Sequence, residues 1–329
     1  MLYLHWVTLF PGKWLTEPER AGYLKNQVAP FRIPTKDGER LFAWLVTPLG
    51  MYAHHVQDFI QEIPAKDDIE QRRAFKLLKE DPEARLLIYF HGNTATVAQG
   101  RRTEEYRMYS SGASDKIFVL AFDYRGFGKS TGSPSELGLM NDAEAVVEWA
   151  LGTAGIAPDR IVLLGHSLGT AVATGITHYY ANLATPTEFA GLILCASFTN
   201  TGSAFASYAI GDLIPNDGTM PWDQTEELFK STLRAATEEV GPDVKVANLG
   251  EAGNQQVWRQ GTRSISKLIA KHGGKLPSRD ALHECAKGPI LTNIDHNTMM
   301  KWAPISLAVL ESFGLTNVSV ARIAETPYE

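Results

Sequence analysis

One pentapeptide in the middle of the chain has the residue types of a catalytic nucleophile. Gly165-His166-Ser167-Leu168-Gly169 has the pattern G-x-S-x-G, with an apolar run before it and a small-residue helix pattern after it. Between a strand and a helix, this pattern forms a tight turn that raises the serine above the end of a sheet. Glycine is expected at both Gly165 and Gly169 because a Cβ there would be crowded. The pentapeptide is weak on its own, but in this context it predicts Ser167 as a nucleophile.

A second glycine-containing segment follows an earlier apolar run. His91-Gly92-Asn93 comes directly after Leu86–Phe90. Acyl transfer needs two backbone N–H groups aimed at the developing oxyanion, one after the nucleophile and one in a loop after an earlier strand. We expect these donors to be the N–H groups of Leu168 and Asn93. His91 precedes the serine, whereas such a site takes its base from a later residue, so we expect His91 to shape the loop.

A serine nucleophile at such a turn works with an acid and a histidine base. Their order along the chain is serine, acid, histidine, so the acid and the base should follow Ser167. His296 lies between an apolar run and an amphipathic final helix pattern, which favours it over His272 as the base. His178 lies in the helix after the serine and is a poor candidate. Spacing alone leaves four acids almost tied: Asp212, Asp217, Asp223 and Asp243.

A third polar segment, with Asp123, Arg125, Gly126 and Gly128, follows another apolar run. Glycines favour tight turns, and an aspartate can pair with an arginine to fix such a turn. This interpretation is favoured over a direct catalytic role for the segment.

Apolar runs of strand length alternate with helix-length patterns, which predicts an α/β fold with a mostly parallel sheet. The later runs are apolar throughout, as in strands covered on both faces. The first run follows the turn signal Lys36-Asp37-Gly38 and is expected to pair antiparallel at the sheet edge. The polar stretch 63–85 is expected to be a solvated helix and loop. The expected strands are Leu41–Thr47, Leu86–Phe90, Lys116–Phe122, Arg160–Gly165 and Gly191–Ala196, and the expected helices are Val97–Ser110, Glu136–Leu151 and Leu168–Leu183.

Composition narrows the class of protein. A chain of 329 residues with 44% hydrophobic residues can bury a large core. A net charge of −6 argues against nucleic-acid binding, and two cysteines exclude a disulfide scaffold or a Cys-rich zinc site. The sequence shows neither a long apolar stretch nor a signal peptide, which favours a cytoplasmic or peripherally membrane-associated protein. The apolar N-terminus is expected to be a packed end, with peripheral membrane contact left open.

Several segments together resemble the fungal branch of the α/β-hydrolase-domain serine hydrolases, whose animal relatives include monoacylglycerol and lysophosphatidylserine lipases. They are FHGN, VAQG, FDYRGFG, STGSPSE, RIVLLGHSLGTAVA and PISLAVL. The resemblance implies an α/β-hydrolase fold, with a mostly parallel central sheet flanked by helices and a reduced cap. It implies a single domain over 26–314, an N-terminal segment over 1–25 and a C-terminal tail over 315–329.

The resemblance also implies Asp217 as the acid and His296 as the base. The family's D-x-x-x-P-W stretch is matched by DGTMPW from Asp217, and its base loop before the last helix is matched by His296-Asn297. Only 21 residues separate Ala196 from Asp217, which indicates a shortened cap and acid loop over 200–222. Whether the acid-bearing strand is also lost stays open. Residues 275–295 form an insertion before the histidine loop.

These residues predict a serine hydrolase that cleaves acyl esters through an acyl-enzyme. The resemblance implies a monoacylglycerol or lysophospholipid substrate, with no metal or organic cofactor. An acyl-thioesterase is a close alternative, since the same triad cleaves thioesters. The altered acid and base segments support a different class of protein, a catalytically impaired hydrolase-fold binding protein. The oligomeric state stays open.

Overall fold

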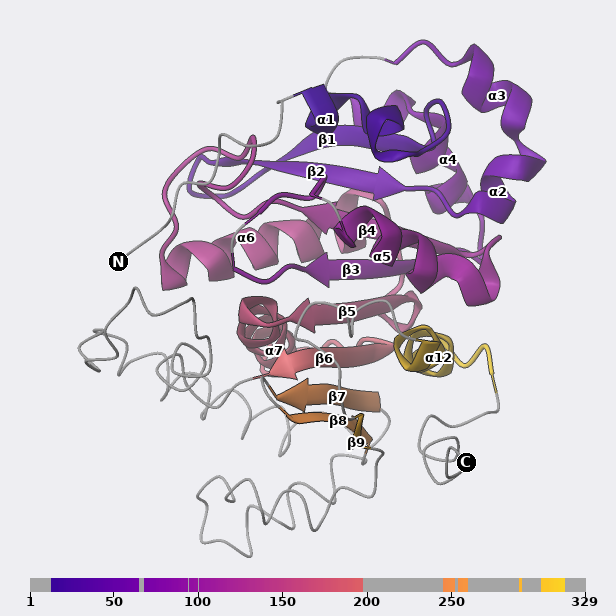
Figure 1. Ribbon diagram of the computed structural model, residues 1–329. Helices are drawn as coiled ribbons and strands as arrows, with labels where there is room; N and C mark the ends of the chain where they lie inside the picture. Colours follow the sequence, from indigo (N-terminus) through magenta and orange to yellow (C-terminus); the bar gives the residue numbers. More distant parts are fainter. Residues whose placement is uncertain are drawn as a thin grey trace, which may run out of the picture.

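The centre of the molecule is one sheet (Figure 1), which has nine strands within the described residues. The computed structural model describes residues 13–64, 68–93, 95–99, 101–197, 245–251, 254–259, 290–291 and 303–316. The strand order across the sheet is β1-β2-β4-β3-β5-β6-β7-β8-β9. The strands are β1 (Val28–Pro34), β2 (Arg40–Val46), β3 (Arg85–Phe90), β4 (Ile117–Phe122), β5 (Ile161–His166), β6 (Gly191–Ser197), β7 (Lys245–Glu251), β8 (Asn254–Arg259) and β9 (Ile290–Leu291).

The middle of the sheet is parallel. Strands β4, β3, β5, β6 and β7 pair in parallel, whereas β1, β2, β8 and β9 make antiparallel pairs. The five strands expected from the sequence are β2 to β6, each within one residue of the expected bounds. The predicted α/β architecture with a mostly parallel sheet is therefore confirmed.

The antiparallel pairing expected for β2 is confirmed, but its expected edge position is wrong, because β1 lies outside it. β1 contains Pro30 and Pro34, and a proline cannot donate to a strand ladder, so prolines are confined largely to edge strands. Because of those prolines, the sequence does not predict β1 as a strand, although its buried residues alternate with more exposed ones.

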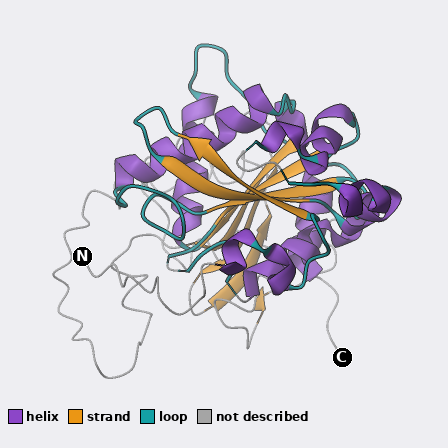
Figure 2. Ribbon diagram, turned by 90° about the horizontal axis from the view of Figure 1, so that it is seen from above, coloured by secondary structure: helices purple, strands orange, loops and turns teal. Residues whose placement is uncertain are grey.

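Helices cover both faces of the sheet (Figures 1 and 2). Helices α2, α3, α4, α6 and α7 share one core cluster with the sheet, and α1, α5 and α12 share the other. The α-helices are α1 (Lys13–Thr16), α2 (Leu49–His54), α3 (Val56–Gln61), α4 (Arg73–Glu80), α5 (Arg101–Ser110), α6 (Glu136–Glu148), α7 (Leu168–Ala181) and α12 (Ala303–Ser312). Short helices of other types are η1 (Pro18–Ala21), η2 (Ile69–Gln71), η3 (Ser111–Ala113), η4 (Trp149–Thr153) and η5 (Pro158–Arg160).

Helix α4 differs from the solvated helix expected for 63–85. Four of its eight residues are buried: Ala74, Phe75, Leu77 and Leu78. They recur at helical spacing on one face, so the polar residues between them occupy the other face. The expectation of a solvated helix rests on the high overall charge of this stretch and overlooks the amphipathic pattern within it.

The sheet continues past β6, with β7 parallel to it. β7 follows Asp217 in the chain, so the sheet has a further strand beyond β6, but this strand does not precede the expected acid. The cap and acid loop at 200–222 and the insertion at 275–295 lie outside the described residues. The limits of the single domain stay a prediction. None of the helices in the described part of the chain is both long and apolar enough to cross a membrane.

Candidate active site

Ser167 stands at a sharp turn between β5 and α7. Its backbone has φ 52° and ψ −119°, a conformation that residues with a side chain rarely adopt. Such strain persists only where the surroundings hold it, and it is typical of functional turns. Three hydrogen bonds secure the turn. The Ser167 N–H donates to the Cys195 carbonyl of β6 at 2.9 Å, and the N–H and the hydroxyl of Thr170 donate to the Ser167 carbonyl at 2.8 and 2.6 Å.

The glycines on both sides of Ser167 are required by space. A Cβ on Gly165 would lie 2.4 Å from the Gly169 carbonyl oxygen. A Cβ on Gly169 would lie 1.9 Å from the carbonyl oxygen of Phe90, at the end of β3. The sequence expectation for Gly165 and Gly169 agrees with this geometry, which also shows that the turn packs directly on β3.

The loop after β3 lies against the same turn. A Cβ placed on Gly92 would lie 3.1 Å from the Ser167 Cβ and 3.1 Å from the His166 Nδ1. Asn93 follows and is exposed, while Ser167 and Leu168 are partly exposed. Strands β3 and β5 are parallel neighbours, so their carboxyl ends meet at one edge of the sheet. The structure thus brings together the segments that carry Ser167, Leu168 and Asn93.

Buried side chains fix the loop at residues 91–99. Arg102, at the start of α5, donates to the carbonyl oxygens of Thr96 at 2.9 Å and Gly92 at 3.3 Å. The Asp123 carboxylate accepts from the Val97 N–H at 2.7 Å. Between these bonds, Ala95 has a φ of 69°, a strained value for a residue other than glycine. The backbone of the loop is therefore held by α5 and by the end of β4.

His91 is enclosed within this region. Its ring packs on Tyr124, with ring centroids 4.4 Å apart, and its Nδ1 lies 2.7 Å from the Gly92 carbonyl oxygen. Since that oxygen can only accept, Nδ1 carries the proton and donates. Burial, and to a lesser degree the charge of Arg102, holds the pKa of His91 well below its usual value. A buried, neutral ring fits the loop-shaping role expected for His91.

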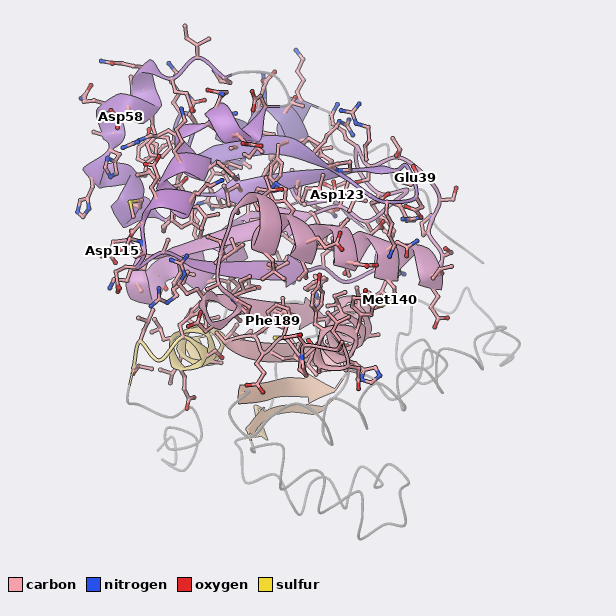
Figure 3. The ribbon with its side chains drawn as sticks, turned by 180° about the vertical axis from the view of Figure 1, so that it is seen from behind. Glu39, Asp58, Asp115, Asp123, Met140 and Phe189 are labelled. Carbon is pink, nitrogen blue, oxygen red and sulfur yellow. The ribbon has the colours of Figure 1, made fainter. Side chains whose placement is uncertain are left out.

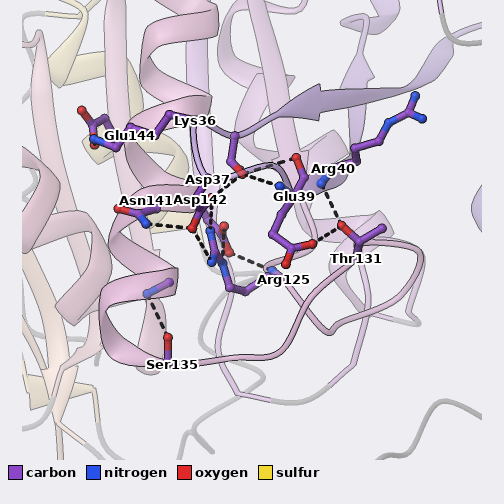
Figure 4. Close-up of polar contacts among 12 residues, drawn as sticks. Lys36, Asp37, Glu39, Arg40, Arg125, Thr131, Ser135, Asn141, Asp142 and Glu144 are labelled. Atoms are coloured by element: carbon purple, nitrogen blue, oxygen red, sulfur yellow. Dashed lines mark hydrogen bonds and ion pairs between the residues drawn. The ribbon is translucent and has the colours of Figure 1, made fainter.

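Arg125 takes different partners from those expected. It donates to Asp142 on α6 at 2.8 Å and to Asp37 in the β1–β2 turn at 2.7 Å (Figure 4). Asp123 instead accepts from the Val97 N–H. Asn141 also donates to Asp37, at 2.9 Å. Hydrogen bonds, above all those from Arg125, hold the pKa of Asp37 well below its usual value. The segment is thus a structural junction between a hairpin, a loop and a helix, as the non-catalytic interpretation expected.

Some of the remaining candidates lie outside the described residues, and others lie within them. Asp217 and His296, together with His272 and the remaining acid candidates, lie outside the described residues. His178 lies on α7, where the amide nitrogen of Asn182 is 2.7 Å from its Nδ1. Cys195 is buried in β6, and burial raises the pKa of its thiol. No group of three or more metal-binding side chains occurs within the ranges that the structure describes.

The sequence does not predict the role of Arg102 in holding the loop after β3. An arginine at the start of a helix pattern usually lies in solvent, and its two carbonyl partners become visible only in three dimensions. The elbow and its loop thus bring Ser167, the Asn93 segment and the positively polarised N-terminal end of α7 to one edge of the sheet.

Comparison with known proteins identifies the family of the chain. Residues 87–296 match the model of the alpha/beta hydrolase family. The chain is 29% identical over 225 residues to lysophosphatidylserine lipase ABHD12 of Danio rerio, covering 68% of this chain and 53% of that protein. It is 40% identical over 154 residues to the Xenopus tropicalis protein of the same name, covering 47% and 38%. It is 38% identical over 125 residues to protein ABHD12B of Homo sapiens, covering 38% and 33%. The chain therefore spans about half, or less, of the length of these relatives.

Solved structures show similarity at lower identity. A crystal structure of an alpha-beta hydrolase from Vibrio vulnificus matches with a TM-score of 0.45 at 16% identity, covering 82% of this chain and 86% of that one. The Pyrococcus furiosus esterase Pf2001 matches with a TM-score of 0.41 at 15% identity, covering 70% and 72%. The family match spans well over half of the chain and includes most of β3, the elbow and β6. The expected α/β-hydrolase fold is confirmed, while the fungal origin stays a prediction. The chain belongs to the alpha/beta hydrolase family.

Proposed function

We propose that the protein is a serine hydrolase that cleaves lipid acyl esters. The observation that carries the proposal is the strained elbow of Ser167, packed against the loop that presents Asn93. A serine held in this conformation between a parallel strand and a helix has the setting of a nucleophile. The names of the relatives, lysophosphatidylserine lipases, support a lipid ester as the substrate class.

In the proposed first step, the Ser167 Oγ attacks the acyl carbonyl carbon, and His296 takes its proton. Asp217 holds the His296 ring in the productive tautomer. The N–H groups of Leu168 and Asn93 stabilise the tetrahedral oxyanion, and losing one such donor typically costs about 10²–10³ in rate. The bond between the acyl carbon and the alcohol oxygen breaks, and the alcohol leaves with the proton from His296.

In the second step, water attacks the acyl-enzyme with His296 as base and releases the free acid and Ser167. The chemistry needs no metal or organic cofactor. Monoacylglycerols and lysophospholipids are the proposed substrates. An acyl thioester is a second candidate, because the same attack and the same oxyanion serve both bonds. A peripheral contact with a membrane surface would bring such a lipid to the site.

Labelling with a fluorophosphonate tests the proposal. The wild type should be labelled and should hydrolyse a lysophospholipid, and Ser167→Ala should lose both properties. Ser111→Ala is the matched control, because Ser111 is exposed on a helix away from the elbow, so it should behave as wild type. Far-UV circular dichroism checks that each variant is folded.

The proposed acid and base are tested with the same assay. His296→Ala and Asp217→Asn should each lower hydrolysis by at least about 10³-fold while leaving the protein folded. Full activity in Asp217→Asn would assign the acid to another carboxylate; Glu251, whose backbone ends β7 at the same sheet edge, is the next variant to make. No labelling of folded wild-type protein would contradict the proposed hydrolase and favour the impaired binding protein.

A further inference from the structure

The carbonyl oxygen of Gly92 accepts two hydrogen bonds from buried side chains. The His91 Nδ1 lies 2.7 Å from it, and the Arg102 Nη2 lies 3.3 Å from it. Both side chains are almost fully enclosed, with His91 1% exposed and Arg102 9% exposed. Two donors on one loop carbonyl, one of them charged, are more than is needed merely to satisfy that oxygen.

The Gly92 carbonyl belongs to the same peptide group as the Asn93 N–H. A peptide bond is planar and trans, so the C=O and the N–H point in opposite directions. The structure contains no cis peptide bond among the described residues, which includes this one. Donors that fix the direction of the Gly92 oxygen therefore also fix the direction of the Asn93 N–H, away from Arg102.

Arg102 can hold this orientation because its guanidinium is a rigid fork. Its Nη1 donates to the Thr96 carbonyl oxygen at 2.9 Å, three residues beyond Asn93. One planar group thus grips the loop on both sides of Asn93. The positive charge of Arg102 beside the Gly92 oxygen also draws electron density through the peptide, which makes the Asn93 N–H a stronger donor.

We propose that Arg102 is a positioning residue of the oxyanion hole, which aims and polarises the Asn93 N–H through the Gly92 carbonyl, with His91 as its partner on that oxygen. The inference rests on the proposed function, since it assigns a purpose to the Asn93 donor of that reaction. Arg102 itself touches neither the substrate nor the serine in this assignment. Its effect appears in the transition state, when the carbonyl oxygen of the substrate becomes an oxyanion.

The variants separate charge from geometry. Arg102→Lys keeps the positive charge but lacks the fork that reaches both carbonyls, and Arg102→Met removes both charge and donors. Arg101→Lys is the matched control, because Arg101 is the exposed neighbour on the same helix turn. His91→Phe keeps a ring against Tyr124 and removes the other donor, while His91→Asn keeps a donor near the position of Nδ1.

The measurement compares a 4-nitrophenyl acyl ester with its thionoester, in which sulfur replaces the carbonyl oxygen. Sulfur is a weak acceptor, so the thionoester gains little from the oxyanion hole. In Arg102→Lys, kcat for the ester should fall about tenfold or more with KM changed less than about threefold. The ester-to-thionoester ratio of kcat/KM should fall about tenfold, and further in Arg102→Met. Arg101→Lys should match the wild type.

The His91 pair keeps the test decisive if Arg102→Met does not fold. His91→Phe should lower the ester-to-thionoester ratio, and His91→Asn should restore part of it. An unchanged ester-to-thionoester ratio in folded Arg102→Lys and His91→Phe would overturn the inference, whether or not the activity toward both substrates falls. Hydrolysis that depends on Ser167 but not on these residues would leave the proposed function standing. Absence of Ser167-dependent hydrolysis in the wild type would overturn both.

Discussion

The carboxyl group of Asp123 is enclosed at the carboxyl end of β4, with no exposure to solvent (Figure 3). Its Oδ1 accepts from the Val97 N–H, and its Oδ2 lies where a Cβ on Gly128 would be only 2.0 Å away. Burial raises the pKa of Asp123 to about 7, although the Val97 N–H and the charge of Arg102 act in the opposite direction. The folded protein therefore retains a proton that the unfolded chain releases near pH 4.

This difference predicts a pH dependence of stability. Because the folded pKa is raised, the contribution of Asp123 to the free energy of unfolding is greatest at low pH and is lost as the pH rises through about 4 to 7. Asp123→Asn keeps the acceptor for Val97 and cannot titrate. Relative to the wild type, the variant should gain on the order of 2 kcal/mol in unfolding free energy between pH 5 and pH 8.

Urea unfolding at pH 5 and pH 8 measures this gain. Asp115→Asn is the control, because Asp115 is exposed and its variant should follow the wild-type curve. If the unfolding free energy changed equally between pH 5 and pH 8 in the wild type and in Asp123→Asn, Asp123 would ionise equally in the folded and unfolded states. That result would contradict the expectation.

For single residues, the sequence predicts contacts between neighbours along the chain better than contacts between residues on different elements. The elbow could be predicted because its glycines, its serine and the flanking strand and helix patterns are consecutive. The position of His91-Gly92-Asn93 directly after β3 could be predicted for the same reason. The partners of Arg125 and Arg102 lie on other elements, and no spacing in the sequence encodes which carboxylate or carbonyl a long side chain reaches.

Among the elements, Arg125 links the β1–β2 turn to α6. Its side chain is 8% exposed and that of Asp142 is fully buried, whereas the nearby Lys36–Glu144 pair leaves the Lys36 side chain 58% exposed. Both pairs end on α6: Arg125 reaches Asp142 from the loop after β4, and Lys36 reaches Glu144 from the β1–β2 turn. They therefore allow a comparison of a buried and an exposed ion pair within one junction.

Arg125→Met should lower the free energy of unfolding by about 3–5 kcal/mol, because it leaves the carboxylate of Asp142 buried without its cation. Lys36→Met, the control, should change it far less, because water screens an exposed pair. Urea denaturation of both variants measures the difference. Equal effects of the two substitutions would mean that burial does not distinguish the pairs.

Elements differ in how plainly the sequence encodes them. The apolar runs of β3 to β6 carry both the length and the composition of buried strands, so the expected bounds agree with the structure within one residue. β1 contains two prolines, and the charge of 63–85 conceals the apolar face of α4. In these elements, the tertiary position decides the structure: an edge strand tolerates proline, and a neighbouring sheet face gives α4 its partner.

For the whole molecule, the core on either side of the sheet dominates stability. Leu163, in the middle of β5, is fully buried among the residues beneath α6 and α7. Leu163→Ala should destabilise the protein by about 2–5 kcal/mol, because it leaves a cavity in a closely packed layer. Leu137→Ala is the control, since Leu137 is 73% exposed on α6, and it should change stability by no more than about 0.5 kcal/mol.

Thermal and urea unfolding of these two variants test the prediction. The Leu163 variant should also lose fluorophosphonate labelling at a lower temperature than the wild type, because β5 leads directly into the elbow. A Leu163 variant as stable as the Leu137 variant would contradict the assignment of β5 to the centre of the core.

The hydrogen bond from the Ser167 N–H to Cys195 and the packing of Gly169 on Phe90 have a consequence for how such a protein can change. The turn, the loop and the carbonyl that hold the serine all come from residues 85–197. The proposed acid and base come from later in the chain. In the proposed mechanism, one continuous part of the chain therefore builds the nucleophile, and insertions or losses after β6 can change the proposed substrate without changing that part.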